Sequence, residues 1–69
     1  MKTNTEIKAL ANKASELSGR SLEQLRQMIR DIRSAIKAGE DKNEVVMHFC
    51  GEDGEDHMDA LRRLAYACL

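Results

Sequence analysis

Two cysteines and two histidines of this 69-residue chain could in principle bind a zinc ion. Cys50, Cys68, His48 and His57 are ligands of the kinds that hold zinc. Their spacing does not fit the common zinc sites, because the chain has no C-x2-C pair and no H-x3-H pair. On a helix, moreover, His48 and Cys50 would point to different sides. We therefore expect no metal site and no cofactor.

Cys50 or Cys68 could also form a catalytic cysteine–histidine pair with His57. A reactive thiolate needs an electropositive and partly exposed environment. The residues that follow Cys50 are strongly acidic, and nearby negative charge raises the pKa of a thiol. Since the sequence shows no catalytic motif, we expect that the protein is not an enzyme.

Carboxylates dominate the region from Glu40 to Asp59, which holds eight of them and a single lysine. Five of them form a candidate acidic patch for partner binding: Glu52, Asp53, Glu55, Asp56 and Asp59. The alternation of ligands in an EF-hand calcium loop is broken here by Gly54. Two interpretations stay open. The run either solubilises the chain and supports a helix N-terminus, or it binds a basic partner surface.

Cations form the opposite feature, in the segment 21–37. Arg26, Arg30, Arg33 and Lys37 are spaced by four, three and four residues, which stacks them along one side of a helix. Guanidinium groups suit bidentate pairing with carboxylates or phosphates. This cationic row is either a solvated face, in which the aliphatic parts of the Arg and Lys side chains cover the edge of the core, or a partner-binding surface.

Charge is divided unevenly between the halves of the chain. Residues 1–37 carry eight Lys/Arg and four Asp/Glu, for a balance of +4, whereas residues 38–69 carry three and eight, for a balance of −5. Such a division indicates internal neutralisation or two oppositely charged surfaces for partners. Nucleic-acid binding through the cationic row is the alternative function. The net charge of −1 and the presence of only two aromatic residues weigh against it.

The cationic row requires a helix, and the sequence predicts one over about 22–38. Apolar residues recur there at helical spacing: Leu22, Leu25, Met28, Ile29, Ile32 and Ile36. Ser21 and Gln24 form a capping-box pattern at its start. Gly39 can take the left-handed conformation that ends helices.

Three further helices are expected over about 5–18, 42–50 and 55–68. Residues 45–50 are rich enough in valine to form a strand, but no other segment offers a partner strand, and a lone strand leaves its backbone groups unpaired. A helix capped by Asp41 is therefore favoured. The predicted fold class is all-α, a small bundle of four short helices that makes one domain over 1–69.

Arg62 and Tyr66 lie one turn apart on the last predicted helix, away from the centre of its apolar stripe. Arginine and tyrosine are enriched at protein interfaces, so the pair is a possible partner contact. It could equally be a helix end that packs against its own bundle.

Composition points to a cytoplasmic protein. The chain starts without the apolar run of a signal peptide, no stretch is long enough to span a bilayer, and two cysteines are too few for a secreted disulfide framework. A core this small often gains stability by self-association, so we expect a homodimer. The predicted function is that of a small non-enzymatic regulator or inhibitor that binds another protein through charged helical surfaces. Mobile genetic elements encode proteins of this kind, although no residue here indicates that origin.

Overall fold

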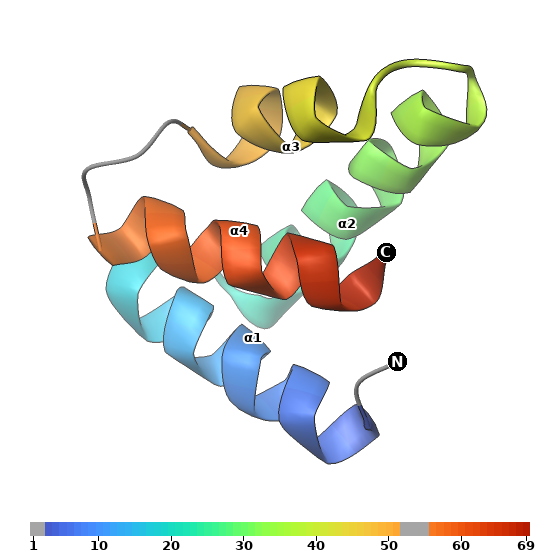
Figure 1. Cartoon of the computed structure of the whole chain (residues 1–69). Helices are drawn as coiled ribbons and strands as arrows, with labels where there is room; N and C mark the ends of the chain where they lie inside the picture. The colour runs from blue at the N-terminus through green and yellow to red at the C-terminus, as the bar shows by residue number, and fades with distance from the viewer. Residues whose placement is uncertain (1–2, 52–55) are drawn as a thin grey trace.

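The computed structural model of the chain describes residues 3–51 and 56–69, which fold into four α-helices (Figure 1). The helices are α1 (Asn4–Ser18), α2 (Leu22–Lys37), α3 (Lys42–Cys50) and α4 (Asp56–Cys68). The all-α bundle predicted from the sequence is thereby confirmed, and each observed bound lies within one residue of the expected one. Residues 45–50 are helical and not extended. None of the described helices is both long and apolar enough to cross a membrane.

Side-chain caps explain where the helices begin. At the start of α1, the hydroxyl of Thr3 accepts a hydrogen bond from the backbone amide of Glu6. The predicted capping box forms at α2: the Gln24 amide donates to Ser21 Oγ (3.1 Å), and the Ser21 amide donates to Gln24 Oε1 (2.8 Å). At the start of α3, the carboxylate of Asp41 accepts a hydrogen bond from the backbone amide of Glu44 at 3.1 Å. Each cap satisfies backbone donors that have no partner within the helix.

A left-handed glycine turns the chain sharply between the first two helices. Gly19 has φ of +74° and ψ of +7°, and its amide donates to the carbonyl of Ser15 at 3.0 Å. A residue with a Cβ atom adopts this conformation only at a cost, which is why glycine stands here. The corner lets α2 leave α1 in a new direction after only three connecting residues.

Helix α4 occupies the middle of the molecule (Figure 1). Helix α1 runs antiparallel to it on one side, and α3 runs antiparallel to it on the other. Helix α2 passes behind α4 and ends beside the start of α3. The contact between α1 and α4 is the most extensive of any helix pair, whereas α1 and α2 touch much less. The two helices that are consecutive in the chain therefore diverge.

Small and medium aliphatic side chains from all four helices make the core. The buried residues are Ala14, Leu25, Met28, Ile29, Ile32, Val45, Val46, Cys50, Ala60, Leu61, Leu64 and Ala65. The predicted apolar stripe of α2 is buried only in its middle, because this helix crosses the others and does not lie along them. Leu22 at one end of the stripe is 42% exposed, and Ile36 at the other end is half-buried.

Candidate partner-binding groove

The cationic row of α2 lies on the surface, and three of its four members line a groove between α1 and α2. Arg26, Arg30 and Arg33 are exposed and line this groove, which has a volume of about 470 Å³. Lys37 is also exposed but lies beyond the groove. We call this feature the α1–α2 groove.

The floor of the α1–α2 groove is apolar. Ile7 and Ala11 of α1, Leu25 and Ile29 of α2, and Leu64 of α4 line it. The groove exists because α1 packs mainly on α4 and diverges from α2. If α1 and α2 lay closer together, they would cover these apolar side chains. Because the two helices diverge, the side chains form the floor of the groove.

Polar residues of α1 form the second wall of the groove. Asn4, Lys8 and Asn12 follow one another at intervals of four residues, which places them on one side of the helix. With Lys8, the described lining of the groove contains four cations and no carboxylate. Sequence reasoning missed this wall. The spacing is visible in the sequence, but only the packing of α1 shows that it faces the arginines of α2.

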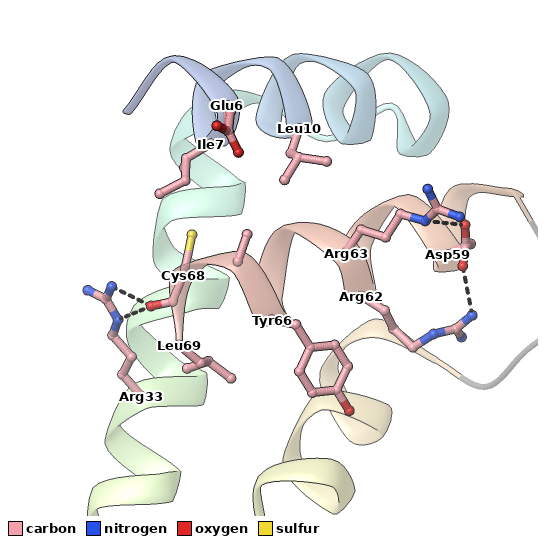
Figure 2. Close-up of a pocket in the computed structure, with 11 residues that line it drawn as sticks. Glu6, Ile7, Leu10, Arg33, Asp59, Arg62, Arg63, Tyr66, Cys68 and Leu69 are labelled. Carbon is pink, nitrogen blue, oxygen red and sulfur yellow. Dashed lines mark hydrogen bonds and ion pairs between the residues drawn. The ribbon is translucent and has the colours of Figure 1, made fainter. Parts of the chain in front are cut away.

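Arg33 differs from its neighbours because its guanidinium is used within the fold. Its Nε and Nη2 atoms donate to the backbone carbonyl of Cys68, at 3.2 and 2.6 Å (Figure 2). This carbonyl belongs to the last residue of α4, where a cation also complements the negative end of the helix dipole. Arg33 therefore fastens the end of α4 to α2.

Arg26, Arg30 and Lys8 make no ion pair or hydrogen bond with the described part of the chain. Three positive groups thus surround an apolar floor without an internal counter-charge. Like charges gathered along one cleft give a positive potential that attracts anionic ligands and raises their rate of association. The groove can bind a molecule that combines apolar surface with negative charge.

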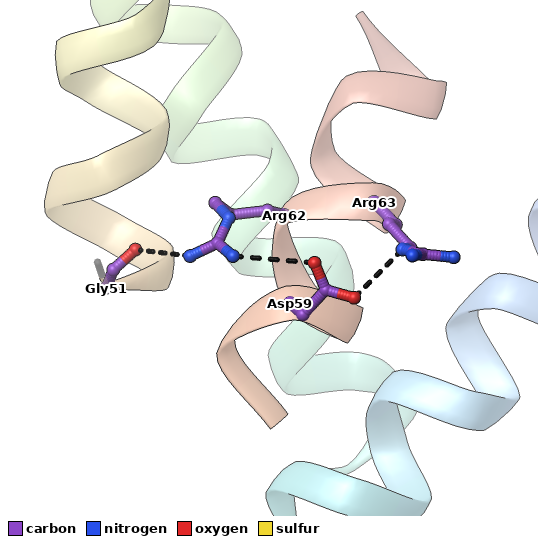
Figure 3. A network of polar contacts seen from close by, with 4 residues as sticks. All are labelled: Gly51, Asp59, Arg62 and Arg63. Atoms are coloured by element: carbon purple, nitrogen blue, oxygen red, sulfur yellow. Dashed lines mark hydrogen bonds and ion pairs between the residues drawn. The ribbon is translucent and has the colours of Figure 1, made fainter. Parts of the chain in front are cut away.

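The acidic patch predicted from the sequence is only partly described. Glu52, Asp53 and Glu55 lie outside the described residues. Asp56 is exposed at the start of α4. The carboxylate of Asp59 accepts a hydrogen bond from Arg62 Nη2 at 3.4 Å and forms an ion pair with Arg63 Nε at 2.9 Å (Figure 3). Asp59 is thus neutralised within its own helix.

The predicted contact pair, Arg62 and Tyr66, holds α4 against α3. Arg62 Nη1 donates to the carbonyl of Gly51 at 3.2 Å (Figure 3), and only 14% of the Arg62 side chain is exposed. The Tyr66 hydroxyl donates to Asn43 Oδ1 at 2.9 Å, and Lys42 Nζ lies 5.6 Å from the centre of its ring. Both residues therefore have contacts within the bundle, while 40% of Tyr66 stays exposed.

The thiols and imidazoles do not come together as a reactive or metal-binding set. Burial raises the pKa of Cys50 to about 11, although Arg20 and Arg62 act in the opposite direction. Burial also raises the pKa of Cys68, against the opposing effect of Arg33. Both thiols are therefore protonated at neutral pH. In residues 3–51 and 56–69, no cluster of three or more His, Cys, Asp or Glu side chains could hold a metal ion.

Comparison of the chain with protein-family models, with curated proteins and with solved structures gives no match.

Proposed function

We propose that the protein is a small, non-enzymatic, cytoplasmic regulator or inhibitor that binds another protein through the α1–α2 groove. The occupant of the groove is an acidic amphipathic helix of that partner. One observation carries the proposal: an apolar floor is bordered by four cations and by no carboxylate in the described lining. The free thiols of Cys50 and Cys68 suit a reducing compartment.

The dimensions of the groove fit a short helix. Along α1, the wall from Asn4 to Asn12 extends about 12 Å, and along α2 the wall from Leu22 to Arg33 extends about 16 Å, at 1.5 Å per residue. These lengths equal about two to three turns of an α-helix. Amphipathic helices bind such grooves through apolar side chains at positions i, i+3 or i+4, and i+7. A volume of about 470 Å³ accepts only a few side chains of that kind.

The two parts of the groove have different roles in binding. Apolar side chains of the partner would cover the exposed end of the α2 stripe, where Leu22 is 42% exposed, and removal of this surface from water stabilises the complex. Carboxylates of the partner would meet Arg26, Arg30 and Lys8 at the rim, which raises the association rate and excludes basic segments.

A nucleic acid fits the groove less well than a protein helix does. Phosphates would use the cations but would leave the apolar floor uncovered. The described lining contains no aromatic side chain on which a base could stack, and stacking supplies much of the affinity for single strands. Nucleic-acid binding is therefore kept as the alternative that the binding experiment must distinguish.

The test measures binding of two fluorescent helical peptides by anisotropy. Both peptides present the same leucine face, and the flanks of that face carry glutamate in one and lysine in the other. A labelled DNA duplex is the third probe. We expect the acidic peptide to bind in a salt-dependent manner and the other two probes to bind far more weakly. Binding of DNA without binding of the acidic peptide would support the alternative, and binding of no probe would refute both.

Matched charge reversals locate the site. Arg26→Glu/Arg30→Glu should weaken binding of the acidic peptide by about tenfold or more. Lys37→Glu is the control for Arg26→Glu alone, since both change the charge by the same amount on exposed residues of the same helix, and Lys37 lies outside the groove. Equal losses in the two variants would show a general charge effect and would remove the groove from the mechanism. Arg33 is left unchanged because it holds α4 in place.

A further inference from the structure

A second charged recess lies toward the other end of α2 from the α1–α2 groove. It has a volume of about 430 Å³ and is lined by Ala35, Glu40, Glu44, Val45, His48 and Phe49. The α2 residues of the α1–α2 groove lie between Leu22 and Arg33, whereas this recess begins at Ala35 and continues on α3. We call it the α2–α3 recess.

The described lining of the α2–α3 recess contains two carboxylates and no lysine or arginine. Glu40 and Glu44 are exposed, and neither carboxylate makes an ion pair or a hydrogen bond with the described part of the chain. The other charged groups nearby are used within the fold, since Asp41 caps α3 and Lys42 lies over the ring of Tyr66. The recess therefore carries negative charge without an internal counter-charge.

An exposed apolar side chain stands beside the α2–α3 recess. Met47 is 44% exposed, more than any other large hydrophobic side chain among the described residues. It follows Glu44 by three residues on α3, so the two side chains lie one turn apart on the same side of the helix. This edge of α3 thus presents an apolar group next to free carboxylates.

The α1–α2 groove has the opposite charge and a matching apolar part. Lys8, Arg26 and Arg30 surround its apolar floor and have no counter-charge within the residues that the structure describes. Opposite charges on two surfaces steer their association and fix how they meet. We therefore infer that the α1–α2 groove binds the α3 edge and the α2–α3 recess of a second copy of the chain. The inference rests on the proposed function, because the second copy then competes with the partner helix for the same groove.

Two kinds of side chain would cross the contact between the copies. Met47 of the second copy would cover part of the apolar floor of the groove, and removal of this surface from water stabilises the contact. Arg26 and Arg30 at the rim would pair with the carboxylates that line the recess, since guanidinium groups suit bidentate pairing with carboxylates. Each copy thus supplies what the surface of the other lacks.

The contact joins two different surfaces of the chain. Helices α1 and α3 lie on opposite sides of α4 (Figure 1), and the groove and the recess belong to different parts of α2. Such a head-to-tail contact leaves a free groove at one end of the assembly, so it can continue to longer chains. Because the nine residues of α3 extend only about 14 Å, the contact is small and should be weak. Self-association should therefore occlude the groove only at high protein concentration.

Charge reversals on the two surfaces test the inference by sedimentation velocity. Arg26→Glu/Arg30→Glu makes the groove acidic, and Glu40→Arg/Glu44→Arg makes the recess basic. Each double variant should raise the dissociation constant of self-association about tenfold or more, because its two surfaces then carry the same sign. The chain with all four substitutions should self-associate again, because the signs are exchanged. A wild-type chain that is monomeric at about 1 mM, or a folded fourfold variant no more associated than either double variant, overturns the inference.

A matched variant excludes a general effect of net charge. Glu16→Arg/Glu23→Arg changes the net charge by the same amount as the recess variant, on exposed residues outside both surfaces. Glu23 lies in the first turn of α2 as Glu44 lies in the first turn of α3, so the effect on a helix dipole is matched as well. This control should self-associate like the wild type, and circular dichroism confirms that each variant keeps its helices. A control as monomeric as the recess variant would refute the inference.

The acidic peptide distinguishes this inference from the proposed function. At low protein concentration, where the chain is monomeric, the peptide tests the groove alone. A wild-type chain that binds the peptide but never self-associates would refute only the inference, and one that self-associates but binds no peptide would refute only the proposed function. In excess, the acidic peptide should dissociate the assemblies, whereas the lysine peptide should not. Assemblies that persist when the acidic peptide saturates the chain would show that the two do not share a groove.

Discussion

Arg33 of α2 donates two hydrogen bonds to the backbone carbonyl of Cys68, thirty-five residues later, at the last position of α4. Helices α2 and α4 make few other contacts with each other. This side chain therefore adds a polar link between α2 and the end of α4 to the packing of the buried residues of α2. Of the three arginines that line the α1–α2 groove, Arg33 thus supports the fold. Arg26 and Arg30 make no such contact with the described residues and are the two that we propose bind a partner.

Replacement of Arg33 by methionine should lower stability while the aliphatic stem is kept. Two hydrogen bonds from a charged group and a favourable helix-end charge would be lost, but both are exposed to water. A decrease of about 1 kcal/mol in the free energy of unfolding is expected. For a domain of this size, that corresponds to about 4–8 °C in the thermal midpoint. Lys37→Met is the matched control, and an equal decrease in both variants would contradict the role of Arg33.

Asp59 should matter more for stability than Asp56, although both lie in the first turn of α4. Asp59→Asn removes the charge that pairs with Arg62 and Arg63, at a cost of about 1 kcal/mol. Asp56→Asn removes a comparable favourable interaction with the helix dipole, but no such pairs. The difference between the two variants in the free energy of unfolding, measured with urea, gives the contribution of the ion pairs. This difference should become smaller in high salt, because Asp59 is half exposed.

The hydrogen bond from Tyr66 to Asn43 should couple α4 to α3. Tyr66→Phe is expected to lower the free energy of unfolding by about 0.5–1 kcal/mol, since the bond is exposed to water. A double-mutant cycle with Asn43→Ala isolates the pair from other effects of each substitution. Additive losses in the cycle would show that the bond contributes nothing in solution.

Buried Cys50 should make stability fall in alkaline solution. Its pKa rises from 9.0 to about 11 because burial disfavours the thiolate. The folded state therefore holds a proton that the unfolded state releases above pH 9, so stability decreases as the pH rises from 9 to 11. The loss at the upper end is up to roughly 2–3 kcal/mol. Tyrosine and lysine titrate in the same range, so the measurement is the difference between wild type and Cys50→Ala. Parallel pH curves for the two proteins would contradict the prediction.

The helices could be predicted from the sequence because their signals are local. The apolar spacing of α2, the Ser21–Gln24 capping box and the positive φ of Gly39 each act within a few residues of one another. Residues 45–50 are ambiguous by composition, and the lack of a segment that could pair with a strand there correctly predicts the helix that is observed. The predicted end of α2, at about residue 38, lies one residue beyond the observed end at Lys37, because Ala38 is the C-cap.

The candidate groove could be predicted only in part. Arg26 and Arg30 follow from spacing on one helix, but Lys8 joins them from another helix, through packing that no local pattern encodes. Arg33 has the same spacing as its neighbours, yet its partner is distant in the chain. Lys37 continues the row but lies past the end of the groove. Contacts over long sequence separations decide which members of a regular pattern share a surface.

Ile7 lines both the α1–α2 groove and a second groove of about 1140 Å³ between α1 and α4. A single turn of α1 is thus a common wall of the two grooves. Any displacement of this turn by one ligand changes the surface that the other ligand meets. Ligands bound in the two grooves would then be thermodynamically linked, and each would change the affinity of the other by the same factor.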